Sequence, residues 1–211
     1  MSDGDQSSVS GDSGVSAVVL AGGLARRMGG IDKGLVELAG KPMVQWALER
    51  VGPQVDCVVV NANRNMDAYA ALGTTVISDT CEGHPGPLAG LLAALQHYGE
   101  SAARVFMCPC DSPFLPHDMI ERMVTALDQN QASVAVAHDG DRQQPVFLLV
   151  DRSCLVSLTA FLDSGERKID RWFADERLVE VNFADKPEAF LNINTEEERL
   201  RVEKDLPVST I

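Results

Sequence analysis

The fold of this chain is decided by VSAVVL at residues 15–20 and AGGLARRMGGIDK at residues 21–33. The apolar run at 15–20 predicts a buried parallel strand, and the glycines after it predict a loop at the carboxyl end of that strand. Open α/β sheets bind phosphate groups at such strand ends, because glycine lets backbone N–H groups approach an anion closely. Arg26, Arg27 and Lys33 supply positive charge to balance a phosphate. We therefore expect a phosphate-binding loop at 21–33.

Two common phosphate-binding motifs do not describe this loop. The P-loop pattern places Ser or Thr after its lysine to bind magnesium, whereas Gly34 and Leu35 follow Lys33. The dinucleotide pattern G-x-G-x-x-G is not matched by GGLAR at 22–26 either. A glycine-rich turn between solvated charges is the simpler alternative. Four glycines and three cations around one strand end favour anion binding instead.

The composition is that of an ordinary globular protein with a strong negative charge. Apolar residues make up 45% and charged residues 23% of the 211-residue chain, which fits one domain over residues 15–211. Residues 1–14 are rich in Ser, Asp and Gly, and we expect them to form a disordered leader. The net charge of −13 argues against nucleic acid or an anionic membrane as a partner. No apolar run approaches the roughly 18 residues of a membrane span.

The cysteines predict a reducing environment. They are five in number, form no C-x-x-C pair and are preceded by no signal peptide, so we expect free thiols in a cytoplasmic protein. The C-x-C pair at 108–110 is weak evidence for a zinc site, and buried structural thiols are the favoured interpretation.

Apolar periodicity predicts a doubly wound α/β fold. Strands are expected at 15–20, 57–60, 75–77, 105–108, 134–137, 145–150 and 178–183. Helices are expected at 43–51, 66–72, 88–98, 116–128, 155–162 and 168–173, and a last helix opens at Thr195 with Glu198 closing a capping box. The β–α alternation predicts a mostly parallel sheet, and the tight turn at 138–141 adds a short antiparallel part.

Polar residues follow several of the predicted strands, where the sheet would bring them to one edge. Asp111 lies just after the strand at 105–108 and is the strongest metal-ligand candidate, because magnesium prefers one or two carboxylates completed by phosphates and water. A turn cap is the alternative role for this residue. Lys33 is assigned to the phosphates, and Asn61 and Asp79 to a base or ribose, with turn positions as their alternative.

Three segments of the opening loop, LAGG at 20–23, RRMGG at 26–30 and DKG at 32–34, resemble the signature of the nucleotidyltransferases. The resemblance is closest to the molybdenum cofactor guanylyltransferases, and CPCD at 108–111 and PGPLAG at 85–90 extend it. It implies a Rossmann-like nucleotidyltransferase fold, Mg²⁺ bound by Asp111, and catalysis by Lys33, Asp111 and Arg27. It further implies GTP contacts at Leu20, Ala21, Gly22, Gly23, Lys33, Asn61, Asp79 and Asp111.

The same resemblance assigns a second substrate, a molybdenum pterin, to the C-terminal half, while the N-terminal half binds GTP. The residues concerned are Arg142, Arg167, Asn192 and Asn194. A hairpin turn, a solvated helix start and an N-cap explain these residues equally well without a ligand. The turn also reads Gln143-Gln144, where bacterial relatives are expected to carry an Asp-His-like pair.

The resemblance implies an activity: transfer of GMP from GTP to the molybdenum–molybdopterin cofactor, with release of pyrophosphate. Carrier and acceptor proteins for the cofactor would be its further partners. Two alternatives stay open at this point. One is a cytidylyltransferase acting on the same pterin or on a sugar or alcohol phosphate, and the other is a non-catalytic carrier of the pterin cofactor.

Overall fold

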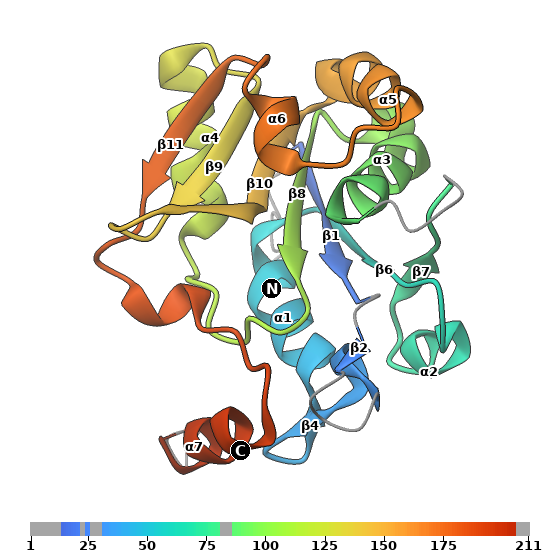
Figure 1. Cartoon of the computed structure of the whole chain (residues 1–211), viewed down its shortest axis with the longest axis vertical. Coiled ribbons are helices and arrows are strands. Elements are labelled where there is room, and N and C mark those ends of the chain that lie inside the picture. Colours follow the sequence, from blue (N-terminus) through green and yellow to red (C-terminus); the bar gives the residue numbers. More distant parts are fainter. Residues whose placement is uncertain (1–13, 22–23, 26–30, 81–85, 206–211) are drawn as a thin grey trace, which may run out of the picture.

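The computed structural model describes residues 14–21, 24–25, 31–80 and 86–205. Within these residues, one sheet of seven strands runs in the order β11-β9-β10-β8-β1-β6-β7 (Figure 1). Its strands are β1 (Val15–Leu20), β6 (Cys57–Asn61), β7 (Thr75–Ile77), β8 (Arg104–Pro109), β9 (Val134–His138), β10 (Gln143–Asp151) and β11 (Leu178–Asn182). The expected leader falls on residues 1–13, which lie outside this description, and on Gly14, whose carbonyl accepts hydrogen bonds from the backbone of Ala103 and Arg104.

The sheet is mostly parallel, as the sequence predicts. β1 pairs in parallel with both β6 and β8, β6 with β7, and β9 with β11. β10 is antiparallel to both of its neighbours, β8 and β9. It is longer than the expected 145–150, and its register shifts between Gln144 and Leu148. The carboxyl ends of β1, β6, β7 and β8 therefore meet at one edge, from which the β9–β10 hairpin also projects.

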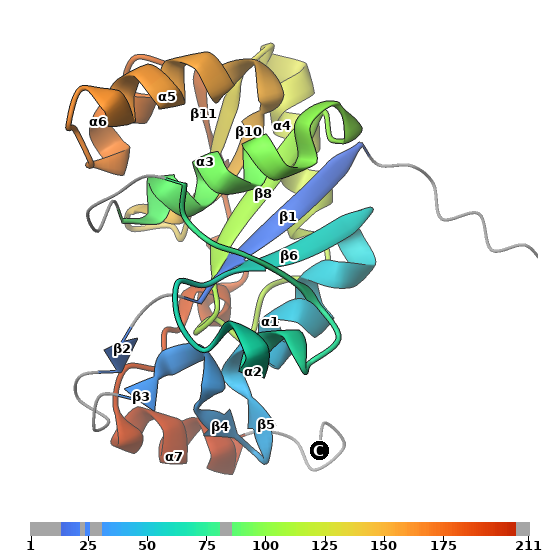
Figure 2. The ribbon, with the colours of Figure 1, turned by 90° about the vertical axis from the view of Figure 1, so that its right-hand side faces the viewer.

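Helices cover both faces of the sheet. They are α1 (Met43–Val51), α2 (Met66–Ala70), α3 (Pro87–Tyr98), α4 (Met119–Asn130), α5 (Leu155–Asp163), α6 (Ile169–Phe173) and α7 (Glu196–Asp205). α3 and α5 lie side by side on one face (Figures 1 and 2), while α1 and α4 pack on the other. α4 begins three residues later than expected because residues 116–119 form a turn in which Met119 N donates to Pro116 O.

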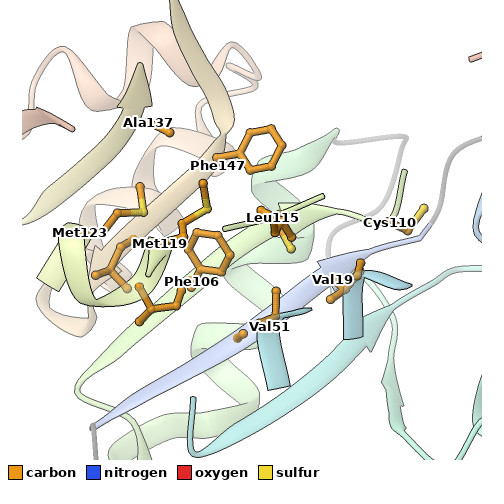
Figure 3. Packing of buried hydrophobic residues seen from close by; sticks show 14 of the residues in the cluster. Val19, Val51, Phe106, Cys110, Leu115, Met119, Met123, Ala137 and Phe147 are labelled. Atoms are coloured by element: carbon orange, nitrogen blue, oxygen red, sulfur yellow. The ribbon is translucent and has the colours of Figure 1, made fainter. Parts of the chain in front are cut away.

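Two apolar clusters fill the spaces between these layers. Along β1, Ala17 and Val19 belong to one cluster and Val18 to the other, as the alternation of a buried strand requires. In the first cluster, Met119 and Met123 of α4 pack with Phe106 of β8 (Figure 3). Burial on both faces explains why these strands read as continuous apolar runs.

A smaller unit lies below the carboxyl edge of the sheet. It contains β2 (Leu24–Ala25), β3 (Ile31–Asp32), the 3₁₀ turn η2 (Lys33–Leu35), β4 (Glu37–Leu38) and β5 (Lys41–Pro42), with α7 against them (Figure 2). α7 is docked by Ile193 and Val202, which share a buried cluster with Leu38, Met43 and Trp46. The C-terminal helix thus packs on the segment that carries Lys33.

The expected capping box at the start of α7 is confirmed. Glu198 accepts a hydrogen bond from the backbone N–H of Thr195 at 2.9 Å, and its own N–H donates to Thr195 Oγ1 at 3.2 Å. Among the described residues, no helix has the length and apolar character needed to cross a membrane.

Candidate active site

The centre of the site is an ion pair between Lys33 and Asp111. Lys33 opens η2 directly after β3, and Asp111 follows β8 by one intervening residue. Their side chains are 13% and 11% exposed, and Lys33 Nζ donates to Asp111 Oδ2. Cys110 N donates to Leu20 O at 3.0 Å, which holds the segment after β8 against the end of β1. Two charged groups separated by 78 residues in the chain thus meet at the carboxyl edge of the sheet.

The two cysteines beside Asp111 belong to the core. Cys108 and Cys110 are buried in the first apolar cluster, and this burial raises the pKa of both thiols well above the usual value. The nearby Asp111 carboxylate raises the pKa of each further, so both thiols stay neutral. Their place in the structure is that of small apolar side chains.

The C-terminal segment closes over the Lys33–Asp111 pair. Lys33 Nζ also donates to Asn194 Oδ1 at 2.6 Å, and Ile193 N donates to Asp111 O at 3.3 Å. Ser112 Oγ donates to Asn192 Oδ1 at 2.7 Å. Asn192 and Asn194, both assigned to the pterin from the sequence, therefore lie next to the proposed catalytic pair.

Glu198 adds a second negative charge near Lys33. Its carboxylate accepts backbone hydrogen bonds from Asn194 at 2.7 Å and from Thr195 at 2.9 Å. These bonds, led by the one from Asn194, and the positive charge of Lys33 lower the pKa of Glu198. Sequence reasoning identified Glu198 only as a helix cap, because its proximity to Lys33 depends on how α7 docks.

A second polar group lies at the ends of β6 and β7. Asn61 Nδ2 donates to Asp79 Oδ1 at 3.0 Å, and Asn63 Nδ2 donates to Asp79 Oδ2 at 2.8 Å. Asn63 Oδ1 in turn accepts from Asp79 N at 2.9 Å. The structure thus brings the predicted Asn61 and Asp79 together. It adds Asn63, whose position in the run NANRN after the strand was the available signal.

The start of α3 lies close against this group. A Cβ atom on Gly90 would come within 2.5 Å of Leu20 Cδ2 and 2.7 Å of Asn61 Oδ1, so glycine is required for the observed packing. Ala21 N donates to Asn61 O at 2.8 Å. Leu20 and Ala21, both predicted to contact GTP, are therefore fixed at the edge of the sheet beside Asn61.

The other predicted residues lie elsewhere or outside the described part of the chain. Gly22, Gly23 and Arg27 fall on residues that the structure does not describe. Arg142 lies exposed in the turn between β9 and β10, where its N–H donates to Asp139 Oδ1 at 2.8 Å. Arg167 makes local contacts, since its Nη1 donates to Leu162 O at 2.7 Å and to Glu166 O at 2.6 Å.

Comparison with known proteins identifies the family to which this geometry belongs. Residues 17–181 match the MobA-like NTP transferase domain. The chain belongs to this family. A Shewanella sp. (strain ANA-3) protein named molybdenum cofactor guanylyltransferase is 50% identical over 192 residues, which are 91% of this chain and 96% of that protein. One of the same name from Shewanella woodyi is 50% identical over 88% of this chain and 93% of its own length.

A solved structure supports the same assignment. It is the molybdopterin-guanine dinucleotide biosynthesis protein A from Archaeoglobus fulgidus, which has 25% sequence identity and a TM-score of 0.74. The alignment covers 93% of this chain and all of that one. The resemblance to the molybdenum cofactor guanylyltransferases, expected from the opening loop, is thereby confirmed, as is the nucleotidyltransferase fold.

Nucleotidyltransferases of this family typically use a divalent metal, and the residues present fit one that is shared with a substrate. Among the described residues, no group of three or more His, Cys, Asp and Glu side chains could hold a metal alone. Asp111 offers one largely buried carboxylate beside a cation. This donor set suits a metal that completes its coordination with nucleotide phosphates and water.

Proposed function

We propose that this protein transfers GMP from GTP to the molybdenum–molybdopterin cofactor, giving its guanine dinucleotide form and pyrophosphate. The observation that carries the proposal is the Lys33–Asp111 ion pair at the carboxyl edge of the sheet, within a chain of the MobA-like family. Nucleotidyl transfer needs a cationic group that stabilises the negative charge of the phosphates and an acidic group that binds a metal. Lys33 and Asp111 supply both in one place.

In the reaction, an oxygen of the pterin phosphate attacks the α-phosphorus of GTP, and the bond from that phosphorus to the bridging oxygen of pyrophosphate breaks. The attacking phosphate is already anionic near neutral pH, so the step needs no strong general base. Lys33 and the backbone N–H groups after β1 bind the triphosphate, and Arg27 holds the leaving pyrophosphate. Asp111 holds Mg²⁺, which neutralises phosphate charge when bound.

Asp79 gives this site a preference for guanine. Its two carboxylate oxygens are held in place by the amides of Asn61 and Asn63. A carboxylate accepts two parallel hydrogen bonds, and guanine presents adjacent ring and exocyclic N–H donors on one edge. Cytosine offers only its exocyclic amine to such an acceptor, so GTP is favoured over CTP.

The pterin approaches from the C-terminal half. Asn192 and Asn194 lie beside Lys33 and Asp111, where the attacking phosphate has to arrive. Arg142, on the exposed turn after β9, and Arg167 contact the rest of the pterin. In this proposal the reaction takes place in the cytoplasm, and carrier and acceptor proteins for the cofactor interact with the enzyme transiently.

The test is pyrophosphate release with Mg²⁺ and each of the four nucleoside triphosphates, with and without the molybdenum–pterin cofactor. We expect release only with GTP and cofactor together, and none from Asp111→Ala. Asp128→Asn is the matched control, because it breaks the ion pair with Arg104 at the opposite end of β8. Release with CTP would overturn the base assignment, and cofactor binding without release from any nucleotide would indicate a carrier.

A further inference from the structure

The hydroxyl of Tyr69 touches both ends of the glycine-rich segment. Tyr69 lies on α2 and is fully buried. Its hydroxyl donates to Asp32 Oδ1 at 2.5 Å and lies 3.1 Å from Ala21 O. Ala21 is the first residue after β1, and Asp32 is the last residue of β3. One side chain from another element thus connects the two ends of the segment that carries the phosphate-binding motif.

The Asp32 carboxylate is held on both of its oxygens. Asp32 is only 5% exposed, and a buried carboxylate is costly unless it is hydrogen-bonded. Tyr69 binds Oδ1, while Asn65 Nδ2 donates to Oδ2 at 3.1 Å. Asn65 precedes α2 with a left-handed backbone, φ 51°. The start of α2 therefore fixes Asp32 through two side chains.

Tyr69 also lies against Gly34. A Cβ atom on Gly34 would come within 2.6 Å of the Tyr69 hydroxyl oxygen, so a larger residue could not occupy this position without displacement. Asp32 and Gly34 are the two chain neighbours of Lys33. The tyrosine hydroxyl therefore lies against the residue on each side of the lysine.

We propose that Tyr69 is a positioning residue for nucleotidyl transfer, which sets the location of Lys33 through Asp32 and Gly34 and ties it to the end of β1 through Ala21. The inference rests on the proposed function of Lys33. A group that must stay aligned with a transferring phosphoryl group loses much of its effect when it shifts by about 1 Å. The contact with Asp32 is therefore part of the catalytic geometry as well as of the fold.

The protonation state of Tyr69 agrees with this role. Burial, followed by the hydrogen bond to Asp32, raises the pKa of Tyr69 well above its usual range. The hydroxyl consequently keeps its proton and remains a donor to the Asp32 carboxylate at every pH at which the protein would be assayed.

The experiment compares Tyr69→Phe with Tyr98→Phe. Tyr98 is the matched control because it is also buried and its hydroxyl donates to a β1 carbonyl, Ala17 O, at 2.7 Å on the α3 face. Each change removes one buried, hydrogen-bonded hydroxyl. We expect Tyr69→Phe to lower kcat of GTP-dependent pyrophosphate release by about 10- to 100-fold. Tyr98→Phe should keep the wild-type kcat and lower thermal stability about as much as Tyr69→Phe does.

A second measurement asks whether the effect acts through Lys33. In a Lys33→Gln background, Tyr69→Phe should cause no further loss of kcat, since the group that it positions is gone. Asp32→Asn should give part of the Tyr69→Phe loss. Wild-type kcat in Tyr69→Phe, an equal loss in Tyr98→Phe, or independent losses in the double variant would each overturn the inference.

Mg²⁺–GTP affinity is measured in parallel to separate the two proposals. If the wild-type protein binds GTP but releases no pyrophosphate, the proposed function fails. The inference about Tyr69 is then decided by binding alone: weaker GTP binding in Tyr69→Phe than in Tyr98→Phe supports it, and equal binding overturns it.

Discussion

The carboxyl edge of the sheet has two parts that are built differently. At the ends of β1, β6, β7 and β8, side chains far apart in the sequence bind one another, as in Lys33 with Asp111 and Asn61 with Asp79. In the turn of the β9–β10 hairpin, the hydrogen bonds of Asp139 are local. Asp139 accepts hydrogen bonds from the N–H groups of Asp141 and Arg142, both at 2.8 Å, within one turn.

The difference follows from strand direction. Parallel strands deliver their carboxyl ends to one edge, so the residues after them converge from separate parts of the chain. β10 is antiparallel, and the connection from β9 is a short turn that satisfies its own polar groups. The first part therefore contains a preassembled charged centre, whereas the second presents an exposed turn. We expect catalysis to depend on the first part much more strongly.

The Lys33–Asp111 ion pair of the first part should matter most for catalysis, and an ion pair outside that part provides the comparison. Lys33→Gln should lower kcat by about 100-fold or more, because the variant lacks the positive charge with which Lys33 stabilises the reacting phosphates. Arg122→Gln is the control, since Arg122 pairs with Asp185 after β11, at 3.0 Å. It should leave kcat unchanged and cost about 1 kcal/mol of stability. Similar kcat losses in both variants would contradict a special role for the ion pair of the first part.

Asn194 tests whether the C-terminal segment works with the first part. Asn194→Ala removes the 2.6 Å acceptor of the Lys33 ammonium, and we expect kcat/KM to fall about tenfold. Asn130→Ala, which removes a local bond to Ala126 O at the end of α4, is the control and should keep kcat/KM. Steady-state pyrophosphate release measures both. An unchanged kcat/KM in Asn194→Ala would contradict the role.

Gly90 within α3 and Gly99 just after it test the role of this helix at the nucleotide side. Gly90→Ala should raise KM for GTP several-fold, because the new methyl group would displace Leu20 and Asn61. Gly99, just after the other end of α3, has φ 54° and open space around it. Gly99→Ala should cost about 1–2 kcal/mol of stability with KM unchanged. If both variants change only stability, α3 does not help to form the GTP site.

The carboxylate of Asp139 in the β9–β10 turn should have the weakest effect of all. This carboxylate accepts backbone hydrogen bonds from Arg142 and Asp141. These bonds, of which the one from Arg142 has the larger effect, lower the pKa of Asp139 from its usual value of 3.8 to about 2. The depressed pKa contributes stability that is present above pH 3.8 and is lost as the pH falls towards 2. Asp139→Asn should therefore lower Tm by roughly 1–2 °C at pH 6. The difference should vanish near pH 2, and a difference that persists there would contradict the assignment.

The strands of the large sheet, its two covering layers of helices and the candidate residues Lys33 and Asp111 could be predicted from the sequence. Apolar runs ended by glycine or polar residues marked the central strands β1 and β8, because burial on both faces leaves a local pattern. Lys33 could be singled out because it lies in the glycine-rich motif after β1, and Asp111 because it follows β8 in the CPCD motif. The capping box of Thr195 and Glu198 was equally readable, since its partners are three residues apart.

Which polar groups meet could not be predicted without the arrangement of the elements in space. Lys33 and Asn194 are 161 residues apart, and their contact depends on the docking of α7 through Ile193 and Val202. Tyr69 reads as one apolar position of a short helix until the fold places its hydroxyl between Ala21 and Asp32. Both contacts were missed for the same cause. The spacing of apolar residues along the sequence indicates which positions are buried and whether a segment is a helix or a strand. A contact between distant segments depends instead on strand order and on the packing of whole elements.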